Sequence, residues 1–325
     1  MRKKPASVSF TGLNGASEMS FHLSRRNFVA GLGSLAAAFA VPNKFASVLT
    51  RAPQKIRFGY AAITWGGNDL QAIKEVGEVG FRGIQLRSPM LKDFGDKPKE
   101  LKTLLTQNRL TFVALSGGGP RNDEYVSADE IATQVKHANF LRETGGLYLQ
   151  MTDSARPKDR KPGSEDFKRL GRLLSDIGKR TADLGIPMAY HNHMRSLGEA
   201  PDEVDALMDA ADPRYVKLLL NVAHYAQGGG DPIRAIEKHH ERILFLHIKD
   251  VESVAPNAES SSNYRFVELG RGRVDLPGVF AALEKVKFEG WAIVELDSVP
   301  DKSRTPKESA MISKRYLESK LGMKI

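Results

Sequence analysis

Residues 243–250 read Ile-Leu-Phe-Leu-His-Ile-Lys-Asp, an apolar run that ends in His247, Lys249 and Asp250. A short apolar run of this kind is typical of a strand that is buried on both faces, as in a parallel sheet covered by helices. Seven similar runs are spaced along the chain: Ile56–Tyr60, Gly83–Arg87, Thr111–Leu115, Leu147–Gln150, Met188–His191, Lys217–Leu220 and Ala292–Glu295.

Helical patterns separate these predicted strands. Phe167, Leu170 and Leu174, for example, recur at the spacing that places apolar side chains on one face of a helix. Asp231-Pro232 and Thr305-Pro306 each pair a capping residue with a proline, which indicates two helix starts. Eight strands, each followed by a helix, predict an α/β fold of the (β/α)8 TIM barrel class, with residues 55–325 as a single domain. A doubly wound sheet is the competing fold, but no G-x-G-x-x-G turn follows the first strand.

The segment Val251–Asp275, after the seventh strand, is the longest stretch without a clear strand or helix pattern. It contains two glycines, Gly270 and Gly272. Since the loops at the carboxyl ends of barrel strands build the active site, we expect an irregular functional loop here.

The composition is that of a globular protein, with 41% hydrophobic and 27% charged residues. The chain of 325 residues contains no cysteine. This absence excludes disulfide scaffolds, cysteine-ligated zinc, iron–sulfur clusters and thiol catalysis.

Residues 1–40 have the features of an export signal. A basic start precedes Ser24-Arg25-Arg26-Asn-Phe-Val, which resembles the twin-arginine motif, and an uncharged run then ends in Ala38-Phe-Ala40. We therefore expect residues 1–40 to be a cleavable twin-arginine-type signal and residues 41–54 to be a linker. The mature protein is expected in the periplasm or another extracytoplasmic compartment.

The charge outside the signal argues against nucleic acid as a partner. The whole chain has a formal charge of +9, but residues 1–40 hold five basic residues and one acidic residue, which leaves +5 for the rest. These charges are scattered and form no basic stripe. With no cysteine to carry a lipid, no stable membrane anchor is expected after cleavage. The sequence leaves open whether the chain forms a homo-oligomer.

Polar residues gather at the carboxyl ends of the last four predicted strands: His191 and His193, Asn221 and His224, His247 and Lys249, Glu295 and Asp297. Such strand ends converge on one pocket in a barrel. Imidazoles and carboxylates without a thiolate suit a divalent ion such as Mn, Co, Zn or Fe. A single histidine at a strand end is more often structural, but four of the eight histidines fall at three consecutive ends.

The remaining aromatic and histidine residues are given simpler roles. His239 and His240 end a predicted helix and are interpreted as structural or surface residues, and His137 is expected to be solvated on a polar helix face. Trp291 is expected in the core. Trp65, just after the first strand, could either stack on a sugar ring or pack in the core.

At these positions the sequence resembles the xylose-isomerase-like TIM barrels, also described as the sugar phosphate isomerase/epimerase family. The motifs are His247-Ile-Lys249-Asp250, Leu220-Asn221-Val-Ala-His224 with Asp231-Pro232, Phe266-Val-Glu268-Leu-Gly270-Arg-Gly272 and Gly290-Trp291-Ala-Ile-Val-Glu295. The resemblance covers about residues 55–322. The stretch Tyr190-His191-Asn192-His193 is more similar to the inosose dehydratase branch, which removes water from a cyclic keto-polyol.

The resemblance implies one divalent metal ion, held in the family by residues after the last four strands. The matching metal-binding positions in this chain are His191, Asn221, His247 and Glu295. The first two depart from the family, which carries Glu and Asp there. Gln85, where relatives often carry Glu, is expected to bind a small-molecule sugar substrate together with Trp65 and Asp297.

The chemistry that the resemblance implies is proton abstraction next to the carbonyl of a keto-sugar or cyclic polyol. An epimerase needs an acid or base on each face of the carbon, and one family glutamate is missing, so dehydration or hydration is favoured. His193 is the first candidate for the acid or base and His224 the second. Glu295 would be a ligand or base, and Lys249 would bind an enolate oxygen or form a structural ion pair with Asp250 or Asp297. A catalytically inactive sugar-binding barrel is the alternative.

Overall fold

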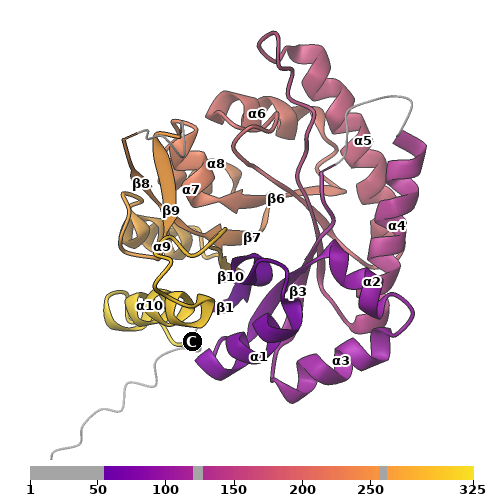
Figure 1. The fold of residues 1–325 in the computed structure, drawn as a ribbon. Coiled ribbons are helices and arrows are strands. Elements are labelled where there is room, and N and C mark those ends of the chain that lie inside the picture. The colour runs from indigo at the N-terminus through magenta and orange to yellow at the C-terminus, as the bar shows by residue number, and fades with distance from the viewer. Residues whose placement is uncertain (1–54, 120–126, 256–261) are drawn as a thin grey trace, which may run out of the picture. The chain divides into compact units, whose positions relative to one another are not determined.

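The computed structural model describes residues 55–119, 127–255 and 262–325 (Figure 1). The predicted signal and linker, residues 1–54, lie outside the described residues. In chain order the elements are β1 (Ile56–Ala61), η1 (Ala62–Trp65), α1 (Asp69–Val79), β2 (Gly83–Arg87), η2 (Ser88–Met90), α2 (Leu91–Phe94), α3 (Pro98–Gln107), β3 (Thr111–Ser116), α4 (Ser127–Thr144), β4 (Tyr148–Met151), α5 (Ser164–Ala182), β5 (Met188–His191), α6 (Pro201–Ala210), β6 (Val216–Asn221), α7 (Val222–Gln227), α8 (Pro232–His239), β7 (Ile243–Ile248), β8 (Asp250–Ser253), β9 (Tyr264–Val267), α9 (Leu276–Lys285), β10 (Gly290–Val294) and α10 (Pro306–Ser319).

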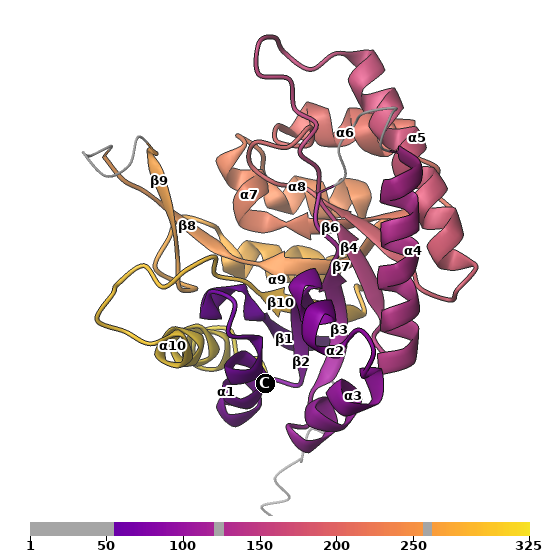
Figure 2. The same ribbon diagram turned by 45° about the vertical axis from the view of Figure 1, so that its right-hand side comes forward.

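Eight strands form a closed barrel in the order β1-β10-β7-β6-β5-β4-β3-β2, and every neighbouring pair is parallel. The helices surround this barrel on the outside (Figures 1 and 2). All eight predicted strands are present, and α8 and α10 begin at the predicted prolines, Pro232 and Pro306. The TIM barrel prediction is therefore confirmed. Within the described residues, none of the helices combines the length and the apolar character needed to span a membrane.

The core has two layers, because side chains alternate between the two faces of each strand. The outer layer packs the strands against the helices. The inner layer fills the barrel with Ala61, Val113, Ala114, Ala189, Leu219, Phe245, Trp291 and Ile293. Trp291 is 2% exposed, as expected for a core residue, and a Cβ on Gly83 would lie only 2.5 Å from its indole ring. The glycine therefore makes room for the largest side chain of the inner layer.

The segment after the seventh barrel strand corrects the expectation of an irregular loop. It contains an antiparallel hairpin, β8 paired with β9, which stands out from the barrel in Figure 2. The carboxylate of Asp250 holds its base by accepting hydrogen bonds of 2.9–3.1 Å from the backbone amides of Val251, Gly270, Gly272 and Val274. The strands have only four residues each, too few for their alternation to stand out in the sequence.

His137 on α4 is buried, so the prediction that it is solvated was wrong. Its side chain lies beside Gln134, with Nδ1 2.9 Å from the amide oxygen Oε1. Burial, together with the neighbouring charge of Lys136, lowers the pKa of His137 to about 4. The helix packs against both α3 and α5, which cover more of its surface than its weak amphipathic pattern indicates.

Candidate active site

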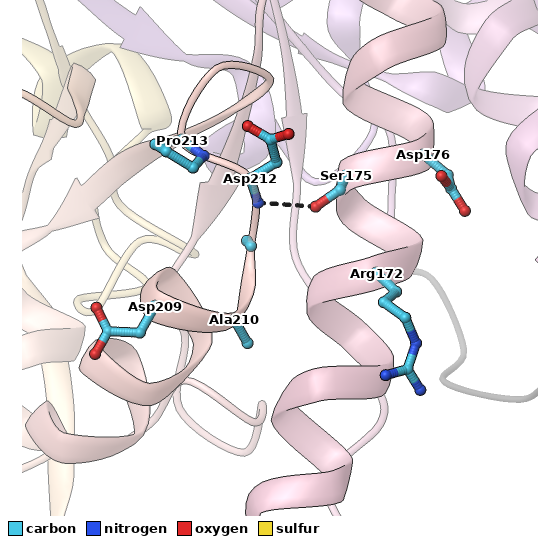
Figure 3. Close-up of a pocket in the computed structure, with 8 residues that line it drawn as sticks. Arg172, Ser175, Asp176, Asp209, Ala210, Asp212 and Pro213 are labelled. Carbon is cyan, nitrogen blue, oxygen red and sulfur yellow. Dashed lines mark hydrogen bonds between the residues drawn. The ribbon is translucent and has the colours of Figure 1, made fainter.

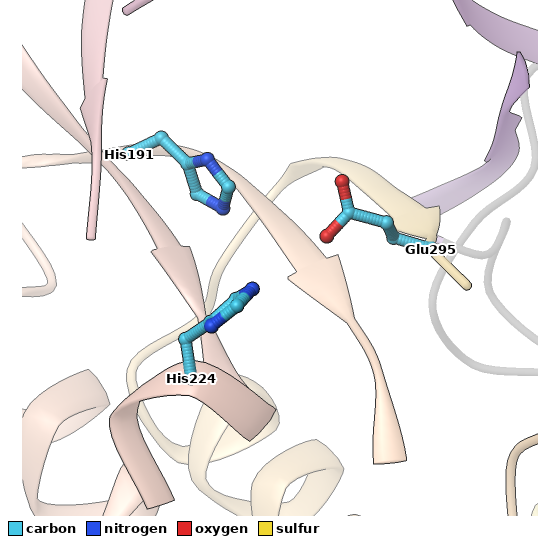
Figure 4. Close-up of side chains that lie close together, drawn as sticks. All are labelled: His191, His224 and Glu295. Carbon is cyan, nitrogen blue, oxygen red and sulfur yellow. The ribbon is translucent and has the colours of Figure 1, made fainter. Parts of the chain in front are cut away.

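Four neighbouring strands place the predicted metal-binding residues together. Each of these residues follows an inner-core residue by two positions, so its side chain points the same way: Ala189 and His191, Leu219 and Asn221, Phe245 and His247, Ile293 and Glu295. All four polar side chains are buried. Figure 4 shows the His191 ring and the Glu295 carboxylate approaching each other, with His224 beside them.

The side-chain amide of Asn221 lies at the centre of this group. Its nitrogen Nδ2 is 2.8 Å from Glu295 Oε2, 3.1 Å from His191 Nε2 and 3.3 Å from His247 Nδ1. Its oxygen Oδ1 accepts a hydrogen bond from the backbone amide of His224 at 3.1 Å and so caps the start of α7. Asn221 thus joins the four strand ends and the helix that follows β6.

Two glutamines, Gln85 and Gln150, contact the ring nitrogens of His247 and His191 that do not face Asn221. His247 donates from Nε2 to Gln85 Oε1 at 2.8 Å, and Gln85 donates to Gln150 Oε1 at 3.2 Å. The amide nitrogen of Gln150 lies 3.0 Å from His191 Nδ1. Nδ1 of the His247 ring lies 3.1 Å from Glu295 Oε2 and 3.3 Å from Asn221 Nδ2. Gln150 was not identified as a site residue from the sequence, although it ends the predicted fourth strand.

The protonation states suit metal binding. Burial and the nearby His247 hold the pKa of His191 well below its ordinary value, so the ring is neutral. Although burial acts to raise it, the pKa of Glu295 is held well below its ordinary value by His247 and Lys249. Two imidazoles and one carboxylate that face a single point fit the donor set of a divalent ion. Ligand atoms of His191, His224 and Glu295 also lie within 4.8 Å of one another.

Lys249 is a fully buried cation beside this cluster. Its ammonium nitrogen lies 2.5 Å from Asp297 Oδ1, 3.1 Å from Glu295 Oε2 and 3.2 Å from His224 Nε2. It also lies 3.8 Å from the centre of the Phe266 ring on the hairpin. Burial acts to lower the pKa of Lys249, but Glu295 and Asp297 raise it above its ordinary value. Of the two ion pairs considered, the structure contains the one with Asp297, while Asp250 holds the hairpin.

The rings of His193 and His224 lie with their centres 3.9 Å apart and their planes tilted by 35°, but only His193 reaches the cavity. His193 lines the cavity, and its Nδ1 lies 2.7 Å from the carbonyl of Met194, so Nδ1 carries the proton and Nε2 is free. His224 is buried behind it, and burial together with Lys249 lowers its pKa well below the ordinary value. Asp153 holds the loop that follows His193, because its carboxylate accepts a hydrogen bond from the backbone amide of Leu197 at 3.0 Å and another from the Tyr190 hydroxyl at 2.7 Å.

A cavity of about 150 Å³ opens above the cluster. Its lining contains five of the predicted site residues, namely Gln85, His191, His193, Glu295 and Asp297. It also contains residues that the sequence analysis missed as functional, namely Arg87, Ser116, Gln150 and Thr152. Trp65 packs in the core instead: its ring meets Tyr60 edge to face at 5.7 Å, and its N–H donates to Glu75.

A second hollow lies on the outside of the barrel between α5 and the end of α6 (Figure 3). It measures about 410 Å³ and is lined by Arg172, Asp176, Asp209 and Asp212 among others. In it, Ser175 accepts a hydrogen bond from the backbone amide of Asp212 at 2.9 Å. Its lining residues include no histidine. They belong to α5, to the end of α6 and to the turn that leads into the amino end of β6, whereas the active site of a barrel lies at the carboxyl ends of the strands. This hollow is therefore no part of the active site.

Comparison with known proteins agrees with the fold. The family model described as Xylose isomerase-like TIM barrel matches residues 73–319. An inosose dehydratase from Lacticaseibacillus casei is 26% identical over 298 residues, covering 82% of this chain and 98% of that protein. The rhizopine catabolism protein MocC from Rhizobium meliloti is 27% identical over 280 residues, covering 76% and 83%.

Among solved structures, the IolI protein with a bound zinc atom matches the fold with a TM-score of 0.67 and 17% identity. The match covers 81% of this chain and 97% of that one. With a family model matched over most of its barrel, the chain belongs to the xylose isomerase-like TIM barrel family and is an enzyme of that superfamily.

Proposed function

We propose that this enzyme removes a proton next to the carbonyl of a keto-sugar or cyclic keto-polyol, with dehydration favoured over epimerisation. The observation that carries the proposal is the convergence of His191 Nε2, His247 Nδ1 and Glu295 Oε2 on one point, the Asn221 amide nitrogen, beside a cavity that His191 and Glu295 line. The relatives named as inosose dehydratases support the reaction class.

The metal is proposed to be one divalent ion of Mn, Co, Zn or Fe. His191, His247 and Glu295 would hold it, with Asn221 as the fourth residue and His224 as a further imidazole within reach. The zinc atom bound by the IolI protein supports an ion in this fold. When bound, such an ion polarises a substrate carbonyl and so acidifies the neighbouring C–H group.

The protein's own groups then account for the proton transfers. His193 Nε2 has a free lone pair and lines the cavity, so it can take the α-proton. The electron pair of the broken C–H bond forms a C=C bond, the β-hydroxyl takes a proton from His193, and it leaves as water. No oxidant or reductant is needed. Asp297 lines the cavity and can accept a hydrogen bond from a substrate hydroxyl, while Lys249 holds both Asp297 and Glu295 in place.

The test is incubation of the metal-loaded protein in deuterated water with inosose and with a keto-glucoside. We expect an ultraviolet-absorbing enone, and its loss in His193→Gln but not in His240→Gln, which changes an exposed histidine. Deuterium exchange with a stereoisomer product and no enone would show epimerisation instead. Sugar binding with neither exchange nor elimination would favour the inactive sugar-binding barrel.

We also propose that the protein is exported by the twin-arginine route and then lies in the periplasm or another extracytoplasmic compartment. The support is the sequence alone: Arg25-Arg26 before an uncharged run. Replacing both arginines by lysine should stop the appearance of a shortened chain outside the inner membrane. Unchanged export would contradict the twin-arginine route.

A further inference from the structure

The lining of the cavity also contains polar side chains that the proposed proton transfers do not use. Arg87 ends β2 and Thr152 follows β4, and both line the cavity. Within the described residues, Arg87 Nε and Thr152 Oγ1 are among the few buried side-chain polar atoms without a hydrogen-bond partner. A buried donor without a partner is costly, so such atoms in a cavity wall indicate where a ligand supplies the missing acceptor.

Among the described residues, Arg87 has only a weak ion-pair partner. The carboxylate oxygen Oδ1 of Asp69 lies 3.9 Å from the guanidinium, beyond hydrogen-bond distance, and this oxygen also has no hydrogen-bond partner. The Arg87 side chain is 28% exposed and that of Asp69 is 6% exposed. Lys249, in contrast, is enclosed by Glu295 and Asp297. The guanidinium of Arg87 is therefore the cation in this cavity wall whose donors remain largely unused.

We propose that Arg87 binds an anionic substituent of the substrate, a carboxylate or a phosphate ester, with help from the hydroxyl of Thr152. A guanidinium presents paired donors that match the oxygens of such groups. The carboxylates that face the same cavity, Glu295 and Asp297, are both paired with Lys249, which limits their repulsion of an incoming anion. A neutral polyol would leave Arg87 Nε without an acceptor and would bind more weakly.

The shared cavity argues that the anion belongs to the substrate itself. Arg87 and Thr152 line the same cavity as His191, so a separate anion would compete with a sugar for the same space. The inference rests on the proposed function only for the part of the substrate that carries the ketone and hydroxyl groups, and not for the anionic group. It narrows the substrate class to a keto-sugar or cyclic keto-polyol that carries a negative charge.

The test is calorimetric binding of three probes that contain no ketone: myo-inositol, which is neutral, quinate, which is a carboxylate, and myo-inositol 1-phosphate. Because these probes cannot undergo the proposed elimination, their binding can be measured whether or not proton abstraction is found. Titrations with and without added Mn show whether the preference depends on a metal. The two anionic probes distinguish a carboxylate from a phosphate ester.

We expect at least one anionic probe to bind about tenfold or more tightly than myo-inositol to the wild-type protein. Arg87→Gln should abolish this preference, whereas Arg172→Gln, which removes an arginine from the outer hollow of Figure 3, should keep it. Asp69→Asn should strengthen the preference, because it removes the only carboxylate paired with Arg87 among the described residues. Equal binding of all three probes, no binding of any, or a preference that survives Arg87→Gln would overturn the inference.

Discussion

Asn221 donates its side-chain amide to Glu295 Oε2 at 2.8 Å, while its side-chain oxygen caps helix α7. The two atoms of one amide therefore have different tasks, because the cap needs an acceptor and the carboxylate needs a donor. A metal ion at this point would meet the NH2 group rather than the oxygen. The cap thus opposes ligation by Asn221.

An aspartate at 221 would remove this conflict, since both of its oxygens are acceptors. One oxygen can cap α7 while the other faces the cluster, but without a metal it would lie next to the Glu295 carboxylate. We expect Asn221→Asp to destabilise the metal-free protein by about 1–3 kcal/mol and to tighten Mn binding about tenfold or more. Thermal unfolding with and without Mn, together with calorimetric titration, measures both effects.

Asn192→Asp is the matched control, because it also places a carboxylate at a buried asparagine near the cluster. Asn192 bonds to the backbone of Asn221 through its oxygen at 2.8 Å and its nitrogen at 3.3 Å, and neither bond involves a predicted ligand atom. It should lose stability without gaining metal affinity. Equal Mn affinity in Asn221→Asp and wild type would show that residue 221 does not contact the ion.

The barrel and the positions of the site could be predicted from the sequence because both follow from local patterns. Met188–His191, for instance, was predicted with the bounds it has, and the polar strand ends do converge. What the sequence could not show depends on contacts between distant strands. The orientation of the Asn221 amide is set by Glu295, 74 positions away, and the enclosure of Lys249 by Asp297, 48 positions away. The unused donors of Arg87 likewise become visible only in the folded cavity wall.

Gln85 should control metal affinity through His247. The side-chain oxygen of Gln85 accepts a hydrogen bond from His247 Nε2 at 2.8 Å and so fixes the ring with Nδ1 3.1 Å from Glu295 Oε2. Loss of the hydrogen-bond partner of a metal-binding histidine typically lowers metal affinity by about 10–100-fold, so Gln85→Met should weaken Mn binding by that factor. Gln134→Met replaces another buried glutamine, which bonds to Gly117 away from the cluster, and should leave affinity unchanged. Parallel loss in both variants would point to general destabilisation instead.

Lys249 should be needed for stability in the absence of a metal. Lys249→Met leaves Glu295 and Asp297 without their shared cation, and breaking a buried ion pair in this way costs about 3–5 kcal/mol. A divalent ion beside Glu295 would restore part of this loss, so Mn should raise the melting temperature of the variant more than that of wild type. Lys285→Met is the control, because its ion pair with Glu237 is exposed and should change stability by less than about 1 kcal/mol. A variant as stable as wild type without metal would contradict the role assigned to Lys249.

His137 should make the protein sensitive to acid. Its pKa is about 4 in the folded chain, below the ordinary value of 6.5, because burial disfavours the charged ring. Between these two values the unfolded chain binds more protons than the folded one, so stability falls as the pH falls. Above about pH 6.5 the ring is neutral in both states, and its full contribution to the free energy of unfolding is present. This contribution, up to about 3 kcal/mol, is lost by about pH 4. Urea unfolding at a series of pH values should therefore show wild type losing more stability than His137→Gln between pH 7 and pH 4, whereas parallel curves would mean that protonation of His137 is not coupled to unfolding.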